Sequence, residues 1–425
     1  MSMASYNRAL ILAGLCVPLI GQVAETPIPP EIPEPEMVHN RYQVVLVHKV
    51  KAKANGRIKI QNLSGDVKII GTDVQVVIVK EKIRVKGVKD KDEAKAIFAK
   101  SMGTLETLDA DSYKFSASPW LSRGISYNYH VEVPNPFSVV TELYGGDVFL
   151  SDLTGDLAVV SGGGDIAVSN TSGKLEVKTG GGDIDVVNVE GRIDLRTGGG
   201  DIEGRKTNGQ VKLQTGGGDI DLWGCQGSFD LATGGGDIEL SDLTGTDIEA
   251  RTGGGDIELK AITANVNLMT SGGDVGVQNL GGNLEAASSG GDLDIENAQG
   301  NVVIFTRSGD ISINRVSGYV RAKTDHGDVE VIDMSLDGVP DEKSEITTRS
   351  GDVYVSYRTD KAVQVEARII GFSPRYAAEY FCGNVDLDLV KDNGNTIGML
   401  KQEAPYHTII IETREGSIEI HQGEE

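Results

Sequence analysis

The feature that most constrains what this chain can fold into is a Gly-Asp pair that recurs every 18 residues. The Asp of the pair occurs eleven times, with one step of 19, at Asp147, Asp165, Asp183, Asp201, Asp219, Asp237, Asp256, Asp274, Asp292, Asp310 and Asp328. A fixed period of this length indicates a solenoid, in which each repeat is one turn of a regular stack. Each repeat also divides into halves nine residues apart, because Gly-Asp-Ile at Asp183 is echoed by Gly-Arg-Ile at Gly191. Each coil is therefore predicted to hold two short strands and two corners.

Two aliphatic columns predict which side of the first strand is inside. The residue after each Asp is Ile, Val or Leu, and the residue two positions further on is aliphatic except at Gly204. A spacing of two puts both columns on one face of a strand. The residues between them, such as Asp185, Asp221 and Glu239, must then face water. The second strand supplies a similar inward pair, for example Leu175 with Val177.

Columns of small residues predict the corners. Gly-Gly-Gly precedes the six Asp residues from Asp165 to Asp256, and such glycines supply positive φ angles and let successive coils approach closely. Four residues before each Asp, from Asp165 onward, stands a Ser or Thr such as Thr197. Its hydroxyl can pair with neighbouring hydroxyls or with corner backbone. The 19-residue step predicts a one-residue bulge near Gly245 that leaves the strand register unchanged.

The fold class that these patterns predict is all-β: a parallel β-solenoid with 18-residue coils and two short strands per coil, capped at both ends. Caps are expected because the ends of the stack expose unpaired strand edges. The predicted organisation is a signal peptide at 1–24, a Pro-rich linker at 25–40, an N-terminal β-rich cap at 41–142, solenoid repeats at 143–352, and a C-terminal β cap at 353–425.

The two predicted caps depart from the regular repeat. The N-terminal cap holds one degenerate coil, which begins at Asn55, an apolar strand from Val74 to Val79, and one short helix within 89–102. That helix presents Ala94, Ile97 and Phe98 on one face. In the C-terminal cap, residues 413–420 are predicted to form the closing strand of the stack.

The N-terminus predicts export. Arg8 precedes an apolar run from Ala9 to Gly21, which is followed by a small residue at Ala24. The run is shorter than the roughly 20 residues that a bilayer span needs, although an uncleaved anchor stays an alternative. The mature protein is expected in the periplasm, on the cell surface or outside the cell. After cleavage Cys225 and Cys382 remain, so a disulfide framework cannot be what holds the chain together.

Several motifs together point to a known family. They are Asn55-Gly-Arg-Ile-Lys-Ile with Ser64-Gly-Asp-Val, Val131-Glu-Val-Pro before the array, the serial Thr-Gly-Gly-Gly-Asp-Ile, and the final Gly416-Ser-Ile-Glu-Ile. In these the chain resembles the bacterial putative-adhesin family of β-strand repeat proteins, over nearly its whole mature length. The resemblance implies a β-repeat fold. It assigns no function, since the adhesin label of that family is itself an inference.

The sharpest candidate site is the ladder of Asp residues. Carboxylates stacked at about 4.8 Å repel one another unless something relieves the charge. Corner Gly N–H groups can donate to each carboxylate, which is a structural role and the preferred interpretation. The alternative is a row of cations, Ca²⁺ above all, on Asp165, Asp183, Asp201, Asp219, Asp237, Asp256, Asp274 and Asp292. The calcium-binding β-roll pattern is not matched, because Asp here abuts the glycines, so no metal or cofactor is favoured.

Net charge restricts the partners. The chain has a net charge of −23, of which −18 lies between Leu143 and Met334. This segment contains 31 Asp and Glu but only 13 Lys and Arg. This charge argues against nucleic acids and anionic membranes. A protein or a cell-surface polymer bound by adhesion is the expected partner, and Trp223 with Gly224 is a candidate contact point. Cys225 shares a column with Leu243 and Ile262 and is expected in the core.

Catalysis is not expected. Corners of about four residues leave no room for the long loops that build an active-site cleft on polysaccharide lyases. The six histidines have no metal-ligand spacing, and no Gly-x-Ser-x-Gly, Walker A or His-Glu-x-x-His motif is present. The chain is interpreted as a non-enzymatic structural or adhesin-like envelope protein, monomeric because of its caps. A calcium-stabilised extracellular module and a filament-forming scaffold stay open as alternatives.

Overall fold

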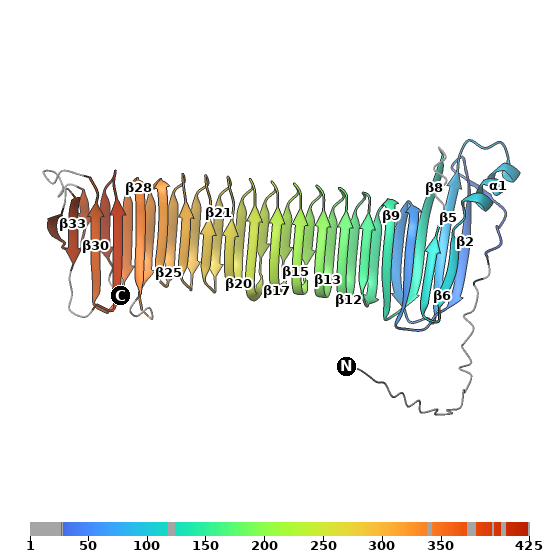
Figure 1. Cartoon of the computed structure of the whole chain (residues 1–425), viewed down its shortest axis with the longest axis horizontal. Helices are drawn as coiled ribbons and strands as arrows, with labels where there is room; N and C mark the ends of the chain where they lie inside the picture. The colour runs from blue at the N-terminus through green and yellow to red at the C-terminus, as the bar shows by residue number, and fades with distance from the viewer. Residues whose placement is uncertain are drawn as a thin grey trace, which may run out of the picture.

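A long stack of β-strands forms the body of the molecule (Figure 1). The computed structural model describes residues 27, 29–117, 124–337, 342–371, 380–392, 395–400 and 405–423. The predicted signal peptide, residues 1–24, lies outside these ranges. The all-β class and the parallel strands are confirmed, and α1 (Lys91–Ser101) is the one helix in the described ranges. No helix among those residues is long and apolar enough to cross a membrane.

The strand that follows each ladder Asp belongs to a first layer, and the other strand of the coil belongs to a second layer. The first layer contains β10 (Val148–Thr154), β14 (Ile202–Arg205), β16 (Ile220–Trp223), β18 (Ile238–Ser241), β21 (Val275–Leu280), β23 (Leu293–Ala298), β25 (Ile311–Ser317), β27 (Val329–Ser335) and β29 (Val353–Arg358). The second contains β9 (Phe137–Gly145), β11 (Leu157–Ser161), β15 (Asn208–Thr215), β17 (Gln226–Thr233), β19 (Thr244–Thr252), β22 (Leu284–Ala287), β24 (Val302–Thr306), β26 (Val320–His326) and β28 (Lys343–Ser350). Three longer strands, β12 (Ile166–Thr179), β13 (Ile184–Thr197) and β20 (Ile257–Met269), continue through a corner into both layers.

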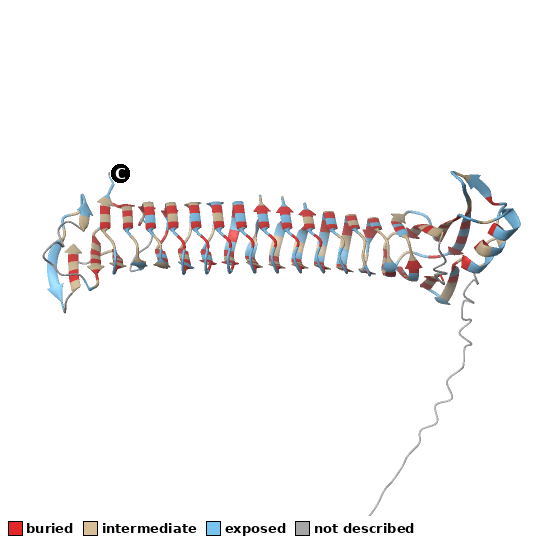
Figure 2. Ribbon diagram, turned by 90° about the horizontal axis from the view of Figure 1, so that it is seen from above, coloured by how far each residue is buried: buried red, intermediate tan, exposed pale blue. Residues whose placement is uncertain are grey.

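Successive coils pair in parallel, with partners 18 residues apart. Ile184 pairs with Ile202, which pairs with Ile220, and these side chains are at most 1% exposed. The inward residues of both layers form one continuous core, and buried and exposed bands alternate along the strands (Figure 2). At the 19-residue step Gly227 pairs with Gly245 but Phe229 pairs with Ile248, so the predicted bulge is confirmed.

The buried hydroxyl column bonds to corner backbone. The Thr197 hydroxyl donates to the Gly182 carbonyl of the preceding coil at 2.7 Å and accepts the Gly200 N–H at 3.2 Å. The same pair of bonds recurs at Thr215, Thr233, Thr252 and Thr270. Of the two predicted pairings for these hydroxyls, the one with corner backbone is formed. Each such bond satisfies a buried carbonyl that would otherwise be costly.

A second column, not anticipated from the sequence, forms the other corner. The residue five places after each ladder Asp has a left-handed backbone, for example Asn170 at φ 52° and Asn188 at φ 56°. Asn tolerates this conformation better than most residues. The Asn188 side-chain amide donates to the Asn170 Oδ1 at 2.9 Å, so the corners are also linked between coils. Gly224, at φ 65°, occupies the same column and is therefore a regular corner residue.

The N-terminal part of the chain adds coils and then reverses strand direction. β3 (Gly56–Ser64) and β4 (Asp66–Thr72), the predicted degenerate coil, stack in parallel on β9 and β10. β7 (Ser112–Ser116) and β8 (Ile125–Pro134) stack on them in turn. Antiparallel strands follow: β5 (Val76–Val85) on β8, β2 (Arg41–Lys51) on β5, β1 (Glu36–Val38) on β2, and β6 (Thr104–Asp109) on β7.

The strand predicted at 74–79 is displaced toward the C-terminus. β5 begins at Val76 and ends at Val85, while Val74 is 46% exposed. The prediction followed an apolar run interrupted only by Gln75, but this antiparallel sheet has one solvated face. Its strand therefore alternates buried residues such as Val79 and Ile83 with water-facing ones such as Lys82. α1 is capped by the Asp90 carboxylate, which accepts the Glu93 N–H at 2.9 Å.

Residues 413–420 do not form the single closing strand that was predicted: they run from the end of one strand through a corner into the next, and further strands lie beyond both. β34 (His407–Thr413) and β35 (Ile418–Gln422) stack on β28 and β29, after a 24-residue step from Val329 to Val353. Beyond them lie β30 (Val363–Ile369), β33 (Asn395–Leu400) and β32 (Asp388–Asp392) in one layer and β31 (Phe381–Gly383) in the other. The chain turns back here because β34 and β35 would otherwise leave an open edge.

Close packing of coils explains the glycine triplets. A Cβ placed on Gly200 would lie 2.3 Å from the Gly182 carbonyl oxygen, whereas one on Gly199 would have nothing within 4 Å. Among the six triplets φ is left-handed only at Gly164, so the prediction of positive φ was wrong for most of them. The third glycine is required by the neighbouring backbone, and the middle one is not.

We expect Gly200→Ala to destabilise the fold by about 1 to 3 kcal/mol, because the backbone of two coils must move apart. Gly199→Ala is the matched control and should be neutral or slightly stabilising, since it restricts the unfolded chain without a clash. Thermal and denaturant unfolding of the two variants measures the difference. Equal losses would mean that close approach of the coils does not explain the triplet.

Candidate functional site

The Asp ladder is held by the backbone of the next coil. The Asp183 N–H donates to the Asp165 Oδ1 at 3.0 Å, and the Asp201 N–H donates to the Asp183 Oδ1 at 2.9 Å. The bond repeats for Asp201, Asp219, Asp237, Asp256, Asp274 and Asp292, each accepting the N–H of the next ladder Asp at 2.8 Å. The predicted structural role of the carboxylates stands, but the predicted donor was wrong, because the next Asp donates instead of a corner glycine.

The ladder geometry uses one carboxylate oxygen of each Asp for folding. Charge-assisted bonds of this kind stabilise an ionised carboxylate without a cation. No group of three or more His, Cys, Asp or Glu side chains with metal-binding geometry occurs among the described residues.

We expect EDTA to leave the thermal unfolding midpoint of the protein unchanged, because the backbone already satisfies the ladder. Differential scanning calorimetry with EDTA, and then with excess Ca²⁺, measures this directly. A sharp fall of the midpoint with EDTA that Ca²⁺ restores would instead assign the ladder to the cation.

A second acidic row lies on the outer surface of the first layer. Asp185, Glu203, Asp221, Glu239 and Glu258 are successive partners in the parallel register. Partial removal from water raises the pKa of Asp221 above its usual range, and the nearby charge of Glu239 raises it further. The pKa of Asp185 is raised by the same two causes, with Glu203 as the neighbour. Asp185 and Asp221 therefore oppose folding while they are ionised.

We expect Asp221→Asn to raise the stability at pH 7, by less than about 1 kcal/mol for a charge this close to solvent. A folded-state pKa above the unfolded value makes the ionised Asp221 destabilising at neutral pH. That cost disappears as the pH falls through the raised pKa to the unfolded value of about 3.9. The gain from the substitution should shrink over the same window in chemical denaturation at several pH values. A gain that stays constant with pH would contradict this origin.

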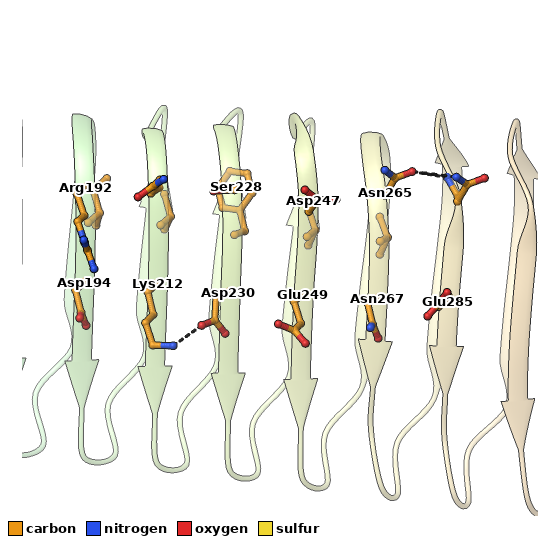
Figure 3. Close-up of a pocket in the computed structure, with 17 residues that line it drawn as sticks. Arg192, Asp194, Lys212, Ser228, Asp230, Asp247, Glu249, Asn265, Asn267 and Glu285 are labelled. Carbon is orange, nitrogen blue, oxygen red and sulfur yellow. Dashed lines mark hydrogen bonds and ion pairs between the residues drawn. The ribbon is translucent and has the colours of Figure 1, made fainter.

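A trough follows the outer surface of the second layer (Figure 3). Its larger part has a volume of about 650 Å³ and is lined by polar residues from six successive strands: Arg192, Asp194, Gln210, Lys212, Ser228, Asp230, Asp247, Glu249, Asn265, Asn267, Asn283 and Glu285. A second part, of about 390 Å³, shares Asn267 and Glu285 with the first and continues over Met269 and Phe305 to Thr347. We call this continuous groove the trough.

Neighbouring coils hold the polar side chains of the trough in place. Lys212 pairs with Asp230 of the next coil, and the Asn283 side-chain amide donates to the Asn265 Oδ1 at 3.2 Å (Figure 3). The larger part presents five carboxylates and two cations, and no His or Cys lines it among the described residues. Met269 is 44% exposed and Phe305 36%, and the Lys323 ammonium lies 5.9 Å from the Phe305 ring centre. The arrangement can donate and accept many hydrogen bonds beside a small apolar surface.

Sequence reasoning missed the trough. It predicted no cleft because corner loops are short, but the groove is formed by the outward residues of the strands themselves. The signal lay in the columns at Arg192 and Asp194, which change residue type from coil to coil while the inward columns do not.

A buried pair in the N-terminal part was also missed. His48 lies 3.3 Å from Glu81, both are at most 2% exposed, and Glu81 also accepts the Gly103 N–H at 2.8 Å. The available signal was Glu81 itself, which interrupts an inward alternation of Val79 and Ile83.

The other sequence candidates lie apart from the trough. Trp223 is 50% exposed on the first layer, and its Nε1 donates to the Asp242 Oδ2 at 3.0 Å. Cys225 is fully buried, as predicted.

Comparisons with known proteins give one family match. The family model described as Toastrack DUF4097 matches residues 242–421, which confirms the resemblance predicted from the sequence for this part of the chain. Two solved structures are similar: a putative adhesin from Bacteroides fragilis (14% identity, 65% of this chain and 96% of that chain, TM-score 0.22), and a putative cell adhesion protein from Clostridium sporogenes (11% identity, 92% and 100%, TM-score 0.18). At these TM-scores neither structure supports an argument about fold or function. No curated protein matches the chain.

Proposed function

We propose, from the premise that residues 242–421 carry a Toastrack DUF4097 domain, that the protein is an exported, non-enzymatic rod with an adhesin-like role at the cell envelope. Its body is a parallel β-solenoid with 18-residue coils, two short strands per coil, closed by a cap at 41–142 and another at 353–425. The observation that carries this proposal is the trough, which continues from Arg192 to Thr347 across successive coils.

An extended partner fits the trough better than a small molecule. Each coil presents polar groups at a spacing of about 4.8 Å, so a linear protein segment or cell-surface polymer could contact many coils at once. Contacts that are individually weak then add along the chain of the partner. The acidic surface of the rod repels nucleic acids and anionic membranes, which leaves polymers without a high negative charge.

Export and a monomeric state complete the proposal. The signal peptide predicted at 1–24 supports export, and the reversal of strand direction at both ends supports a stack that does not extend into filaments. Cell fractionation combined with protease treatment of intact cells tests the location. Recovery of the protein in the cytoplasm would refute it. Light scattering tests the monomeric state.

We expect Ser228→Trp, at the centre of the larger part of the trough, to weaken binding to purified cell walls of the producing bacterium at least tenfold. A bulky ring there blocks several coils sterically. Ser169→Trp, on the outer surface of the first layer, is the matched control and should bind like the wild type. Co-sedimentation measures both, with circular dichroism to verify folding. Equal binding by the two variants would exclude the trough as the adhesive surface.

A further inference from the structure

Charge is distributed very unevenly along the molecule. Residues 41–142 contain 17 Lys and Arg against 11 Asp and Glu, a net charge of +6, whereas 143–334 carries −18. The positive part lies at one end of the stack, where β2, β5 and β8 extend the first layer (Figure 1). The net charge of the whole chain, which argued against anionic membranes, conceals this basic end.

The cations gather on the outer surface of one antiparallel sheet. Strand alternation turns Val44, Leu46 and His48 inward and their neighbours outward. We call the outward surface the basic face: Gln43, Val45, Val47, Lys49 and Lys51 on β2, Ile78, Lys80, Lys82 and Arg84 on β5, and Asn128, His130 and Glu132 on β8. It carries five Lys or Arg and one carboxylate, Glu132, which pairs with Lys80 at 2.5 Å.

Apolar side chains lie among these cations. Val45 is 44% exposed and pairs across the sheet with Lys82, while Val47 is 39% exposed and pairs with Lys80. Lys49 is opposite Ile78. Exposed aliphatic groups between lysines are typical of surfaces that lie at a membrane interface, where the aliphatic groups reach the acyl boundary and the ammonium groups meet anionic headgroups.

The chain enters the molecule beside this face. β1 pairs with the start of β2, where Glu36 is opposite Gln43, and the predicted apolar run ends at Gly21, 15 residues before β1. Those residues can span at most about 50 Å when fully extended. Glu34 of this connection forms an ion pair with Lys95 of α1 at 2.9 Å, which fixes the connection at the same end of the stack.

We propose that the basic face rests on an anionic lipid surface. Because β2, β5 and β8 extend the first layer and the trough lies on the outer surface of the second layer, a molecule that rests on its basic face presents the trough away from the membrane. This inference does not depend on the adhesive role of the trough. The competing occupant is the acidic rod of a second copy, which also complements the charge.

The test is co-sedimentation of the full chain with vesicles of phosphatidylcholine alone and of phosphatidylcholine mixed equally with phosphatidylglycerol. Binding to the neutral vesicles reports any contribution of the N-terminal apolar run, and the excess on the anionic vesicles reports the basic face. We expect an excess that disappears at high salt, because the attraction is electrostatic.

The decisive variant is the double substitution Lys49→Gln and Lys82→Gln. Each removed cation should weaken binding to an anionic surface by about 1 kcal/mol. The excess binding to the anionic vesicles should therefore fall roughly 30-fold. Lys49→Glu with Lys82→Glu should abolish it. Lys260→Glu with Arg307→Glu, on the rod, makes the same charge change as the second pair and should leave the excess largely intact. Thermal unfolding verifies that each variant is folded.

Three outcomes would overturn the proposal. One is equal binding to the two kinds of vesicle, and another is an equal loss in the face and rod variants. The third is a salt-sensitive dimer in sedimentation equilibrium, abolished by the Lys49 and Lys82 substitutions, without any preference for anionic vesicles. That result would assign the basic face to a second copy of the chain.

Discussion

The structure depends on close stacking of nearly identical coils through their backbones. No single coil can offset the entropy of ordering eighteen residues with the few aliphatic side chains that it buries. Stability comes from the interface between neighbours, as in other repeat architectures. The Thr197 hydroxyl, the Asp183 carboxylate and Gly200 all serve this interface, since each one contacts the backbone of an adjacent coil.

The 18-residue period predicted the structure of the repeated coils, but it carried no information about the two ends of the stack. The buried stripe through Ile184, Ile202 and Ile220 follows from strand alternation and an 18-residue step, and both are visible in the sequence. The donor to each ladder Asp could not be chosen in advance, because it depends on the distance between coils, and several N–H groups were equivalent candidates. The ends were predicted least well. β5 and the strands after β29 pair antiparallel or return over the stack, and no repeat encodes that change of direction.

The outward-facing columns can vary between coils because they do not contribute to the core, so a binding surface has to be built from them. Inward positions are aliphatic in nearly every coil, with Gly204 and Cys225 as exceptions, so they carry little information about a ligand. An outward position is free to change, and the column at Arg192 passes through Gln210 and Ser228 to Asn265. A trough built from such columns is difficult to recognise in sequence, because each residue taken singly is an ordinary solvated strand residue.

Net charge illustrates how an average misleads for an elongated molecule. Electrostatic interactions between exposed groups are screened beyond about 10 Å in ordinary salt, so a surface at one end of a long rod does not sense the charge at the other. The basic face and the acidic rod therefore act as separate electrostatic objects that happen to share a chain. For a compact domain the sum of −23 would describe most approaches of a partner. For this rod the net charge of −23 does not describe the approach of a partner to either part. A charged partner is attracted or repelled according to whether it meets the basic face or the acidic rod.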